Sequence, residues 1–219
     1  FWIMKQSNLS KIWSLTLVLV ISLCNPFTST FGQAPLPTFS GGVLTKFPVS
    51  NQLYPRDLVT NKGTVEFAGS LADPSVYSGV RVKVFRDINN NGTYASGELA
   101  TTLDGVLGPV VNGFRSFSFN PYLLNAELVN HQFLLVGVRP STVEDVLVTV
   151  NDVVAGDAYI LHGQSNAEST NWESPTTPVN SEPNRKFVRV YGNSTEQDYE
   201  TTMPKNWYVG DGTIGNRAF

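Results

Sequence analysis

The sequence predicts a β-sandwich that is followed by the beginning of an α/β domain. Apolar and polar side chains alternate in residues 64–72, 80–87, 114–120 and 132–138, and clusters of Gly, Pro and Asn separate these segments. This alternation is typical of strands with one buried face, and short strands recurring in this way indicate a sandwich. Residues 153–161 are instead almost continuously apolar, as expected of a central parallel strand buried on both faces. The two patterns therefore predict two fold classes in succession.

The order of these segments predicts where each domain begins and ends. We expect an export signal at 1–33, a linker at 34–42, a β-sandwich at 43–150 and the start of an α/β domain at 151–219. A doubly wound α/β domain needs several βα units of about 30 residues each, which this last segment cannot supply. The second domain is therefore expected to be incomplete, and the sequence to be a fragment. Within the sandwich, residues 121–131 are expected to form either a short helix or an apolar loop.

The first 33 residues have the pattern of an export signal. Lys5 and Lys11 precede an apolar run at 12–23. This run is too short to cross a bilayer, which takes about 20 residues, but it fits the apolar part of a signal peptide. With cleavage expected near Gly32, the mature chain should have no transmembrane span. We therefore expect a protein that is secreted, periplasmic or located at the cell surface.

The single cysteine lies in this leader and leaves a second interpretation open. A lipid could be attached at Cys24, although Leu23 occupies the position where a small residue normally precedes a lipidated cysteine. In either case the mature sandwich would hold no disulfide, so its stability must come from core burial. Met4 is the expected start of translation, which would place residues 1–3 upstream of it.

The composition describes an ordered globular protein. Apolar residues make up 41% of the sequence and charged residues 15%, which argues against intrinsic disorder. The formal net charge is −3, whereas domains that bind nucleic acid carry basic patches. Nucleic acid is therefore not an expected partner.

The stretch GDAYILHGQSN at 156–166 raises the question of whether Ser165 is a nucleophile. A serine placed where a buried strand ends exposes its hydroxyl at the edge of a sheet, and Gly163 allows the sharp turn that this needs. Serine attacks esters only when a base removes its proton and hydrogen-bond donors stabilise the oxyanion. The alternative, from these residues alone, is a hydroxyl in an ordinary turn.

A family resemblance favours the nucleophile. AGDAYILHGQSNAES at 155–169 resembles the first sequence block of the sialate O-acetylesterase and acetylxylan esterase group of SGNH hydrolases, whose α/β fold is flavodoxin-like. The resemblance implies a nucleophilic Ser165 supported by Gln164 and Asn166. It also implies an exported bacterial carbohydrate O-acetylesterase that acts on an acetylated glycan, with acetylated xylan, sialic acid and pectin-type substrates all left open. Catalysis of this kind needs no metal or organic cofactor.

A second stretch, from KFVRVYGNS to WYVGDGTIG at 186–215, is similar to the part of bacterial members that follows the first block. In those proteins a glycine of the second block lends its backbone N–H to the oxyanion hole, beside the N–H of the serine itself. The resemblance therefore implies Ser165 and Gly215 as the oxyanion donors, with Gly212 as the second choice for the glycine.

The remaining blocks of the family are absent from the sequence. G-x-N-D is missing, and so is D-x-x-H, which supplies the base and its orienting carboxylate. The two histidines are His131, expected in a turn, and His162. His162 lies three residues before Ser165, on the opposite face of a strand and about 10 Å away along it, which is beyond the reach of a general base. We therefore expect the catalytic His and Asp to lie outside this sequence, and the fragment alone to be inactive.

A non-catalytic interpretation stays open beside the esterase. A surface protein could bind a glycan or another partner through its sandwich, with the GQSN region as an inactive relic. The two interpretations differ in one requirement, because an esterase needs the D-x-x-H block downstream and a binding module does not.

Residues 87–98, DINNNGTYASGE, match the D-x-[DN]-x-[DN]-G-x5-E pattern of a calcium loop. Oxygen ligands at this spacing suit Ca²⁺, which takes six to eight of them. The loop also resembles those of B-type repeats in bacterial surface adhesins, although Ala95 stands where they usually carry Asp. The alternative is an Asn-Gly hairpin that simply joins two strands. The expected ligands of this structural site are Asp87, Asn89, Asn91, the Thr93 carbonyl and Glu98.

Overall fold

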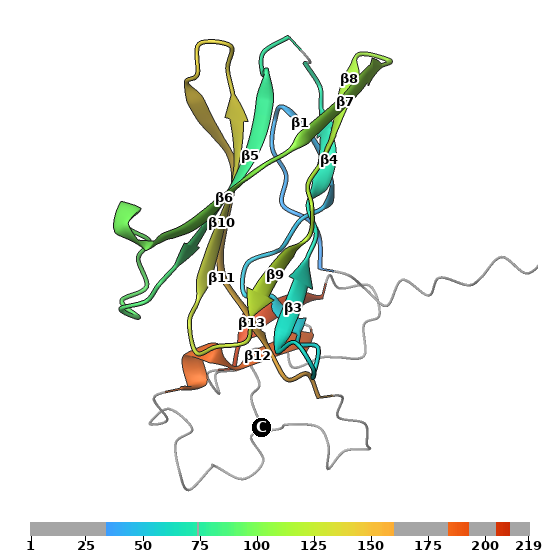
Figure 1. Ribbon diagram of the computed structural model, residues 1–219. Helices are drawn as coiled ribbons and strands as arrows, with labels where there is room; N and C mark the ends of the chain where they lie inside the picture. Colours follow the sequence, from blue (N-terminus) through green and yellow to red (C-terminus); the bar gives the residue numbers. More distant parts are fainter. Residues whose placement is uncertain (1–33, 74, 160–183, 193–204, 211–219) are drawn as a thin grey trace, which may run out of the picture. The chain divides into compact units, whose positions relative to one another are not determined.

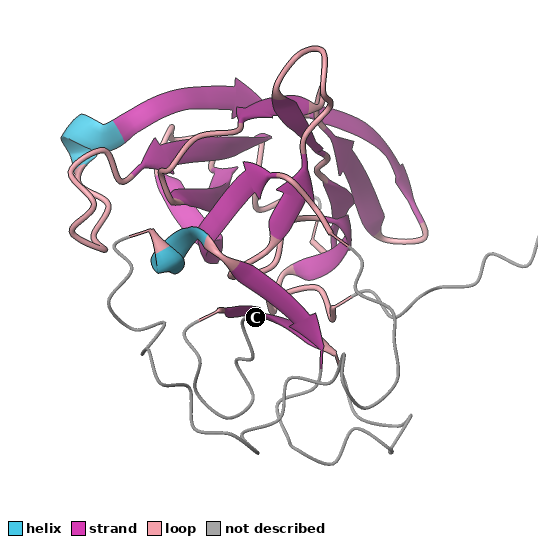
Figure 2. Cartoon of the chain, turned by 90° about the horizontal axis from the view of Figure 1, so that it is seen from below, coloured by secondary structure: helices cyan, strands magenta, loops and turns pink. Residues whose placement is uncertain are grey.

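The computed structural model describes residues 34–73, 75–159, 184–192 and 205–210. These residues belong to one compact unit that begins at Ala34. Their regular structure is almost entirely β-strand, with two short 3₁₀ helices, as Figure 2 shows. The elements are β1 (Gly42–Lys46), β2 (Leu53–Pro55), β3 (Lys62–Val65), β4 (Ala68–Leu71), β5 (Gly79–Arg86), η1 (Ser96–Glu98), β6 (Leu99–Asp104), β7 (Val106–Val111), β8 (Phe114–Ser118), β9 (Tyr122–Asn125), β10 (His131–Val138), β11 (Glu144–Gly156), η4 (Arg185–Phe187), β12 (Arg189–Gly192) and β13 (Asn206–Val209).

Two sheets supply most of the fold. One has four strands in the order β1-β4-β8-β7, and the other has five in the order β2-β11-β10-β5-β6. Neighbouring strands are antiparallel, except that β2 and β11 pair in parallel. Figure 1 shows β5, β10 and β11 facing β4 and β8, and residues of both sheets contribute to one hydrophobic core. This mostly β architecture in several sheets is consistent with the expected β-sandwich.

The alternation in the sequence has a direct cause in the burial of β5. Val80, Val82 and Val84 are buried, while the residues between them are partly exposed. Successive side chains of a strand point to opposite faces of the sheet, so every second residue can face the core. The valines on this face pack against the opposite sheet and fix the register of β5.

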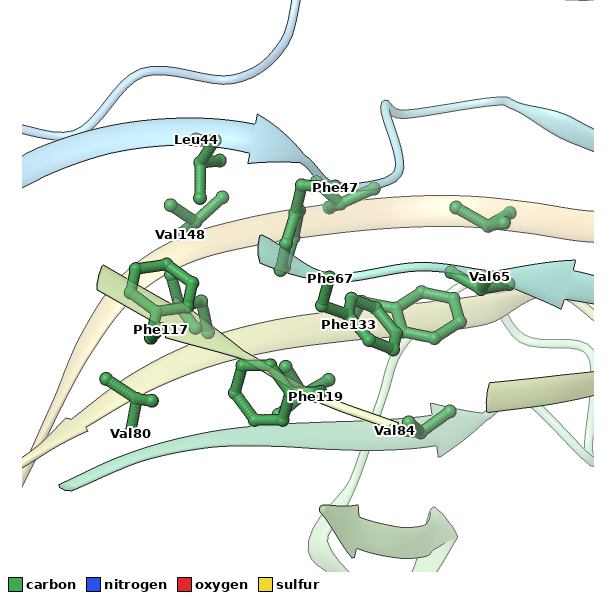
Figure 3. Close-up of a cluster of buried hydrophobic side chains, with 14 of the residues drawn as sticks. Leu44, Phe47, Val65, Phe67, Val80, Val84, Phe117, Phe119, Phe133 and Val148 are labelled. Atoms are coloured by element: carbon green, nitrogen blue, oxygen red, sulfur yellow. The ribbon is translucent and has the colours of Figure 1, made fainter. Parts of the chain in front are cut away.

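Phenylalanines fill the core between the sheets. The ring centroid of Phe67 lies 5.5 Å from that of Phe47 and 5.8 Å from that of Phe119. Phe133, on β10, lies 5.7 Å from Phe67. All four side chains are buried, and Figure 3 shows them gathered in one cluster between the strands. Edge-to-face and tilted ring pairs stabilise a core beyond the effect of area burial alone, so Phe67 is the centre of this cluster.

β11 extends beyond the expected end of the sandwich. It crosses the expected boundary between residues 150 and 151 and ends at Gly156. Val153 pairs with His131 on β10, and the three residues after Val153 pair with β2. The apolar run at 153–161 was expected to be a central strand of an α/β sheet. Its first residues instead form the end of β11, a strand of the sandwich.

The segment expected as a linker contacts the core. Ala34 is buried, and Leu36 and Phe39 pack against the buried cluster. Phe39 also forms an isolated bridge with Gly42, where β1 begins. Residues 34–42 are therefore part of the domain, because their apolar side chains are covered by it.

Within 121–131, expected to form a short helix or a loop, residues 122–125 form β9 and residues 126–130 form a loop before β10. β9 pairs with β3 in antiparallel register. Leu124 is fully buried and Leu123 is 51% exposed, which is the alternation of a strand. The adjacent leucines hid this alternation in the sequence, since both are apolar although only Leu124 is buried.

β7 lies at the edge of the four-stranded sheet and is interrupted in its middle. Its pairing with β8 shifts register between Leu107 and Val110. Pro109 lies in this interval and has no backbone N–H to donate. Val106 and Val111, at the two ends of β7, are exposed. This edge is therefore apolar in its side chains but broken in its backbone pairing.

β12 and β13 form a separate antiparallel pair. The rings of Tyr191 and Trp207 pair across the two strands, with centroids 5.0 Å apart. The strand expected at 186–192 is thus present from Arg189 onward, after a turn of 3₁₀ helix. Within the described residues, no helix has the length and apolar character to span a membrane.

Candidate functional site

The residues expected to catalyse ester hydrolysis lie outside the described part of the chain. They comprise Ser165 with its neighbours Gln164 and Asn166, and the two candidate glycines Gly212 and Gly215; His162, which was not expected to act as the base, lies outside it too. The structure describes the strand that leads to the GQSN motif, and it describes β12 and β13, which lie between the two candidate parts of the oxyanion hole in sequence.

A groove of about 1110 Å³ lies where β11 ends. Its walls come from the end of β11, the residues before β10, and β12 with β13. Tyr159, Tyr191 and Trp207 contribute aromatic side chains, and Arg56 and Glu127 contribute charged ones. Apolar and aromatic walls with a few polar groups are typical of sites for small molecules, so this groove is the candidate binding site among the described residues.

An ion pair fixes the chain where it leaves β11. Asp157 accepts hydrogen bonds from Arg56, from Nε at 2.6 Å and from Nη2 at 3.2 Å. Arg56 Nη1 also donates to Asn61 Oδ1 at 2.6 Å. The hydrogen bond and the charge of Asp157 raise the pKa of Arg56. Both side chains are partly exposed, so the pair adds little to stability, but it holds the first residues of the GDAYILHGQSN motif beside β2.

Arg189 is buried and holds β12 on the sandwich. Its Nη2 donates to Asn130 Oδ1 at 2.8 Å and to the Asp152 carbonyl at 2.6 Å. Its Nη1 donates to the Lys186 carbonyl at 2.6 Å. Burial lowers the pKa of Arg189 to about 10, and the charge of Asp152 opposes this effect. The guanidinium is therefore charged at neutral pH, and these acceptors are what makes its burial tolerable.

Replacing Arg189 by methionine should loosen β12. The apolar stem would remain, but Asn130 and Asp152 would each lose a buried donor, at a cost of about 1–3 kcal/mol. Backbone amides of β12 should then exchange with solvent about 10- to 100-fold faster. Hydrogen–deuterium exchange followed by mass spectrometry would measure this.

The control for this experiment is an arginine in an exposed ion pair. Arg139 donates from Nε to Asp145 Oδ2 at 2.6 Å on the surface. Arg139→Met should leave exchange in β12 unchanged. If Arg189→Met also left it unchanged, or if both variants raised it equally, Arg189 would not be the anchor of β12.

His131 is buried at the start of β10, where a turn was expected. It is 1% exposed, and its Nε2 lies 3.5 Å from Glu127 Oε1. Burial lowers the pKa of His131 to about 4, although the charge of Glu127 acts in the opposite direction. The ring is therefore neutral at pH 7, and its contact with Glu127 is not an ion pair. A buried imidazole of this kind packs the core.

The loop expected to bind calcium joins β5 to β6 in an antiparallel hairpin. Asn91 N–H donates to Asp87 Oδ1 and Gly92 N–H donates to Asp87 Oδ2, both at 2.9 Å. Asn89 Oδ1 accepts from Asn91 N–H at 3.0 Å. The structure therefore brings the first three candidate ligands together around the backbone of the loop.

The second half of the loop contributes Thr93 and Glu98. Thr93 donates to Asn91 Oδ1 from its N–H at 2.8 Å and from its hydroxyl at 2.6 Å. Glu98 is buried in η1, and its Oε2 accepts from Ala95 N–H at 3.0 Å. No group of three or more His, Cys, Asp or Glu in the described part of the chain could hold a metal ion. The loop offers a different set of oxygen ligands: two carboxylates, two Asn side chains and a backbone carbonyl.

The contacts of Arg189 were missed by the sequence analysis. Asp152, one of its acceptors, has a positive φ of 60°, and its Oδ1 accepts from the Tyr94 hydroxyl at 2.9 Å. Burial raises the pKa of Tyr94, and the nearby charge of Asp152 adds to this. The available signal was the charged residue in V-R-V, because a charge inside an apolar strand needs partners when it is buried.

No protein-family model, curated protein or solved structure matches this chain. A functional assignment therefore depends on the residues themselves. Two sequence patterns suggest a function: the motif at 156–166 resembles that of a serine esterase, and the loop at 87–98 matches a calcium loop. Arg189 connects β12 to Asn130 and Asp152.

Proposed function

We propose that this protein is an exported carbohydrate O-acetylesterase of the SGNH type, of which these residues include the sandwich and the nucleophile. The observation that carries the proposal is the motif GDAYILHGQSN at 156–166, which starts at the last residue of β11. In the family that it resembles, the same succession of Gly, Asp, an aromatic residue and G-Q-S-N ends in the nucleophilic serine. The groove at the end of β11 supports the proposal, since Tyr191 and Trp207 offer aromatic surface to a sugar ring.

The proposed reaction begins at Ser165. Its Oγ attacks the carbonyl carbon of the acetyl group, and the proton of the hydroxyl passes to a general base. The N–H groups of Ser165 and Gly215 donate to the oxyanion of the tetrahedral intermediate. Collapse releases the sugar alcohol, which takes the proton, and leaves an acetyl ester on Ser165. Water, deprotonated by the same base, then hydrolyses that ester, which releases acetate and restores the serine.

The base of this reaction has to be a histidine other than His131. That ring is buried in β10 and has a pKa of about 4, so it is neither accessible nor matched to proton transfer at neutral pH. His162 would lie on the opposite face of the strand expected to lead to Ser165, and too far along it. We therefore assign the base and its orienting carboxylate to a D-x-x-H block that is not among these residues.

The test begins with the source DNA beyond the codon for Phe219. We expect an open reading frame that continues with G-x-N-D and then D-x-x-H. The longer chain should release acetate from p-nitrophenyl acetate and from acetylated xylan, and Ser165→Ala should lower kcat/KM by at least about 10³-fold. Ser118→Ala is the matched control, because Ser118 is an exposed serine on β8, and it should leave the rate unchanged.

Two outcomes would contradict the esterase. One is a Ser165→Ala variant that hydrolyses acetyl esters as fast as the unchanged protein, and the other is a stop codon directly after Phe219, which would leave the serine without a base. The second outcome would favour a non-catalytic surface protein that binds glycans. The aromatic lining of the groove would serve both candidates, and the binding protein would bind oligosaccharides in a calorimeter without releasing acetate.

A further inference from the structure

The loop at 87–98 begins and ends on two buried carboxylates. Asp87 is 1% exposed and Glu98 is 7% exposed. Phe85 pairs with Leu99 across the hairpin, so both carboxylates lie at the base of the loop, where its two strands meet. Among the described residues, no Lys, Arg or His forms an ion pair with either of them.

Two buried carboxylates without a basic partner need something else to neutralise them. Buried charges in proteins are paired with opposite charges or coordinate metal ions. Glu98 Oε1 has no hydrogen-bond partner among the described residues. Each carboxylate oxygen of Asp87 accepts one N–H and therefore keeps a second lone pair. Both carboxylates thus have free acceptor capacity at the base of the loop.

We propose that this loop binds one Ca²⁺ and that the bound ion fixes the loop to β12. The ligands from side chains are Asp87, Asn89, Asn91 and Glu98, and the Thr93 carbonyl is the backbone ligand. Asn91 Oδ1 becomes available to the ion when the Thr93 hydroxyl releases its hydrogen bond to it. All are oxygens, which are the ligands that Ca²⁺ takes, and neutral Asn and carbonyl oxygens suit its flexible coordination better than the strict octahedron of Mg²⁺. This inference is independent of the esterase proposal, because it concerns only the sandwich and β12.

The loop contacts the two residues that accept hydrogen bonds from Arg189 Nη2. Asp87 N–H donates to the Asn130 carbonyl at 3.0 Å, while Asn130 Oδ1 accepts from Arg189. Tyr94, in the middle of the loop, donates its hydroxyl to Asp152 Oδ1, while the Asp152 carbonyl accepts from Arg189. An ion that orders the loop therefore also orders the two groups that hold β12.

Calcium binding would be measured on the full chain after EDTA treatment and removal of the chelator. Calorimetric titration with CaCl₂ should show one site per chain, with a Kd on the order of 10⁻⁴–10⁻³ M, as in extracellular calcium modules. Saturating Ca²⁺ should raise Tm, because the ion binds the folded state. It should also slow hydrogen–deuterium exchange of the β12 amides.

The test variants remove one carboxylate charge each. Asp87→Asn and Glu98→Gln should raise the Kd by about 10-fold or more and reduce the effect of Ca²⁺ on Tm. Glu98→Gln is the more informative of the two, because glutamine keeps an oxygen to accept from Ala95 N–H and the fold is retained. Asp57→Asn is the matched control: Asp57 also accepts the N–H groups of its own turn, but it is exposed. Its calcium response should equal that of the unchanged protein.

Several results would overturn the proposal. No heat of binding and no change of Tm with Ca²⁺ would exclude the site, and an undiminished response in Glu98→Gln would place the ion elsewhere. If Mg²⁺ gave the same heat of binding and the same rise in Tm as Ca²⁺, the choice of metal would be wrong. Calcium binding with unchanged exchange in β12 would refute the connection to Arg189.

Discussion

Replacing Phe67 by alanine should lower the free energy of unfolding by about 3–5 kcal/mol, the range found for large aromatic side chains in cores. Phe67 is 2% exposed and pairs with three other aromatic rings. Its partners include Phe133 on β10 and Phe119 just after β8, so they come from opposite sheets. Strands held by their own hydrogen bonds cannot all move inward to fill the space, and a cavity would remain. Urea unfolding followed by circular dichroism should show a lower midpoint at an unchanged slope.

An exposed phenylalanine provides the control for this prediction. Phe114, at the start of β8, is 46% exposed. Phe114→Ala should cost about 1 kcal/mol or less, because surface substitutions rarely cost more. If Phe67→Ala cost no more than Phe114→Ala, Phe67 would not be the centre of the core.

Lowering the pH from 7.5 to 4 should cost the unchanged protein about 3 kcal/mol more stability than a His131→Gln variant. The pKa of His131 is lowered in the folded state from 6.5 to about 4, mainly by burial. The unfolded chain therefore binds the proton more readily than the folded chain between these values. The stabilising contribution is complete above pH 6.5 and is lost as the pH falls toward 4. Each pKa unit corresponds to about 1.36 kcal/mol.

Paired urea curves at half-unit pH steps would measure this difference. Carboxylates titrate in the same range, but they contribute to both proteins and cancel in the comparison, apart from Glu127, which lies near the ring. Glu127→Gln in both backgrounds removes that coupling. If the unchanged protein and His131→Gln lost stability in parallel, the buried imidazole would not be held neutral.

Strands that stay within one sheet were the most predictable part of the fold. The alternation at 80–87 and 132–138 predicts two strands, and β5 and β10 lie there. The alternation at 64–72 predicts one strand, but the structure has two, β3 and β4, which belong to different sheets. The chain changes sheet at Glu66 and Phe67, and the buried Phe67 keeps the alternation intact across the change. Periodicity shows which side chains are buried, but not which sheet receives them.

Local patterns and distant contacts also differ in how well the sequence predicts the polar features of the structure. The loop at 87–98 could be found in the sequence because its chemistry lies within one short pattern. The anchor formed by Arg189 could not, because its acceptors Asn130 and Asp152 are 59 and 37 residues away in sequence. No local pattern records such a contact, and only the fold of β10 and β11 brings these residues to β12.

The broken edge strand β7 has a consequence for the protein at high concentration. An apolar strand at the edge of a sheet invites a strand of a second molecule to pair with it, which is a common start of aggregation. Such pairing needs a continuous row of backbone donors and acceptors, and in β7 Pro109 and the register shift interrupt that row. A neighbouring molecule can therefore pair with no more than a short part of β7, so its valines can face solvent without seeding fibrils.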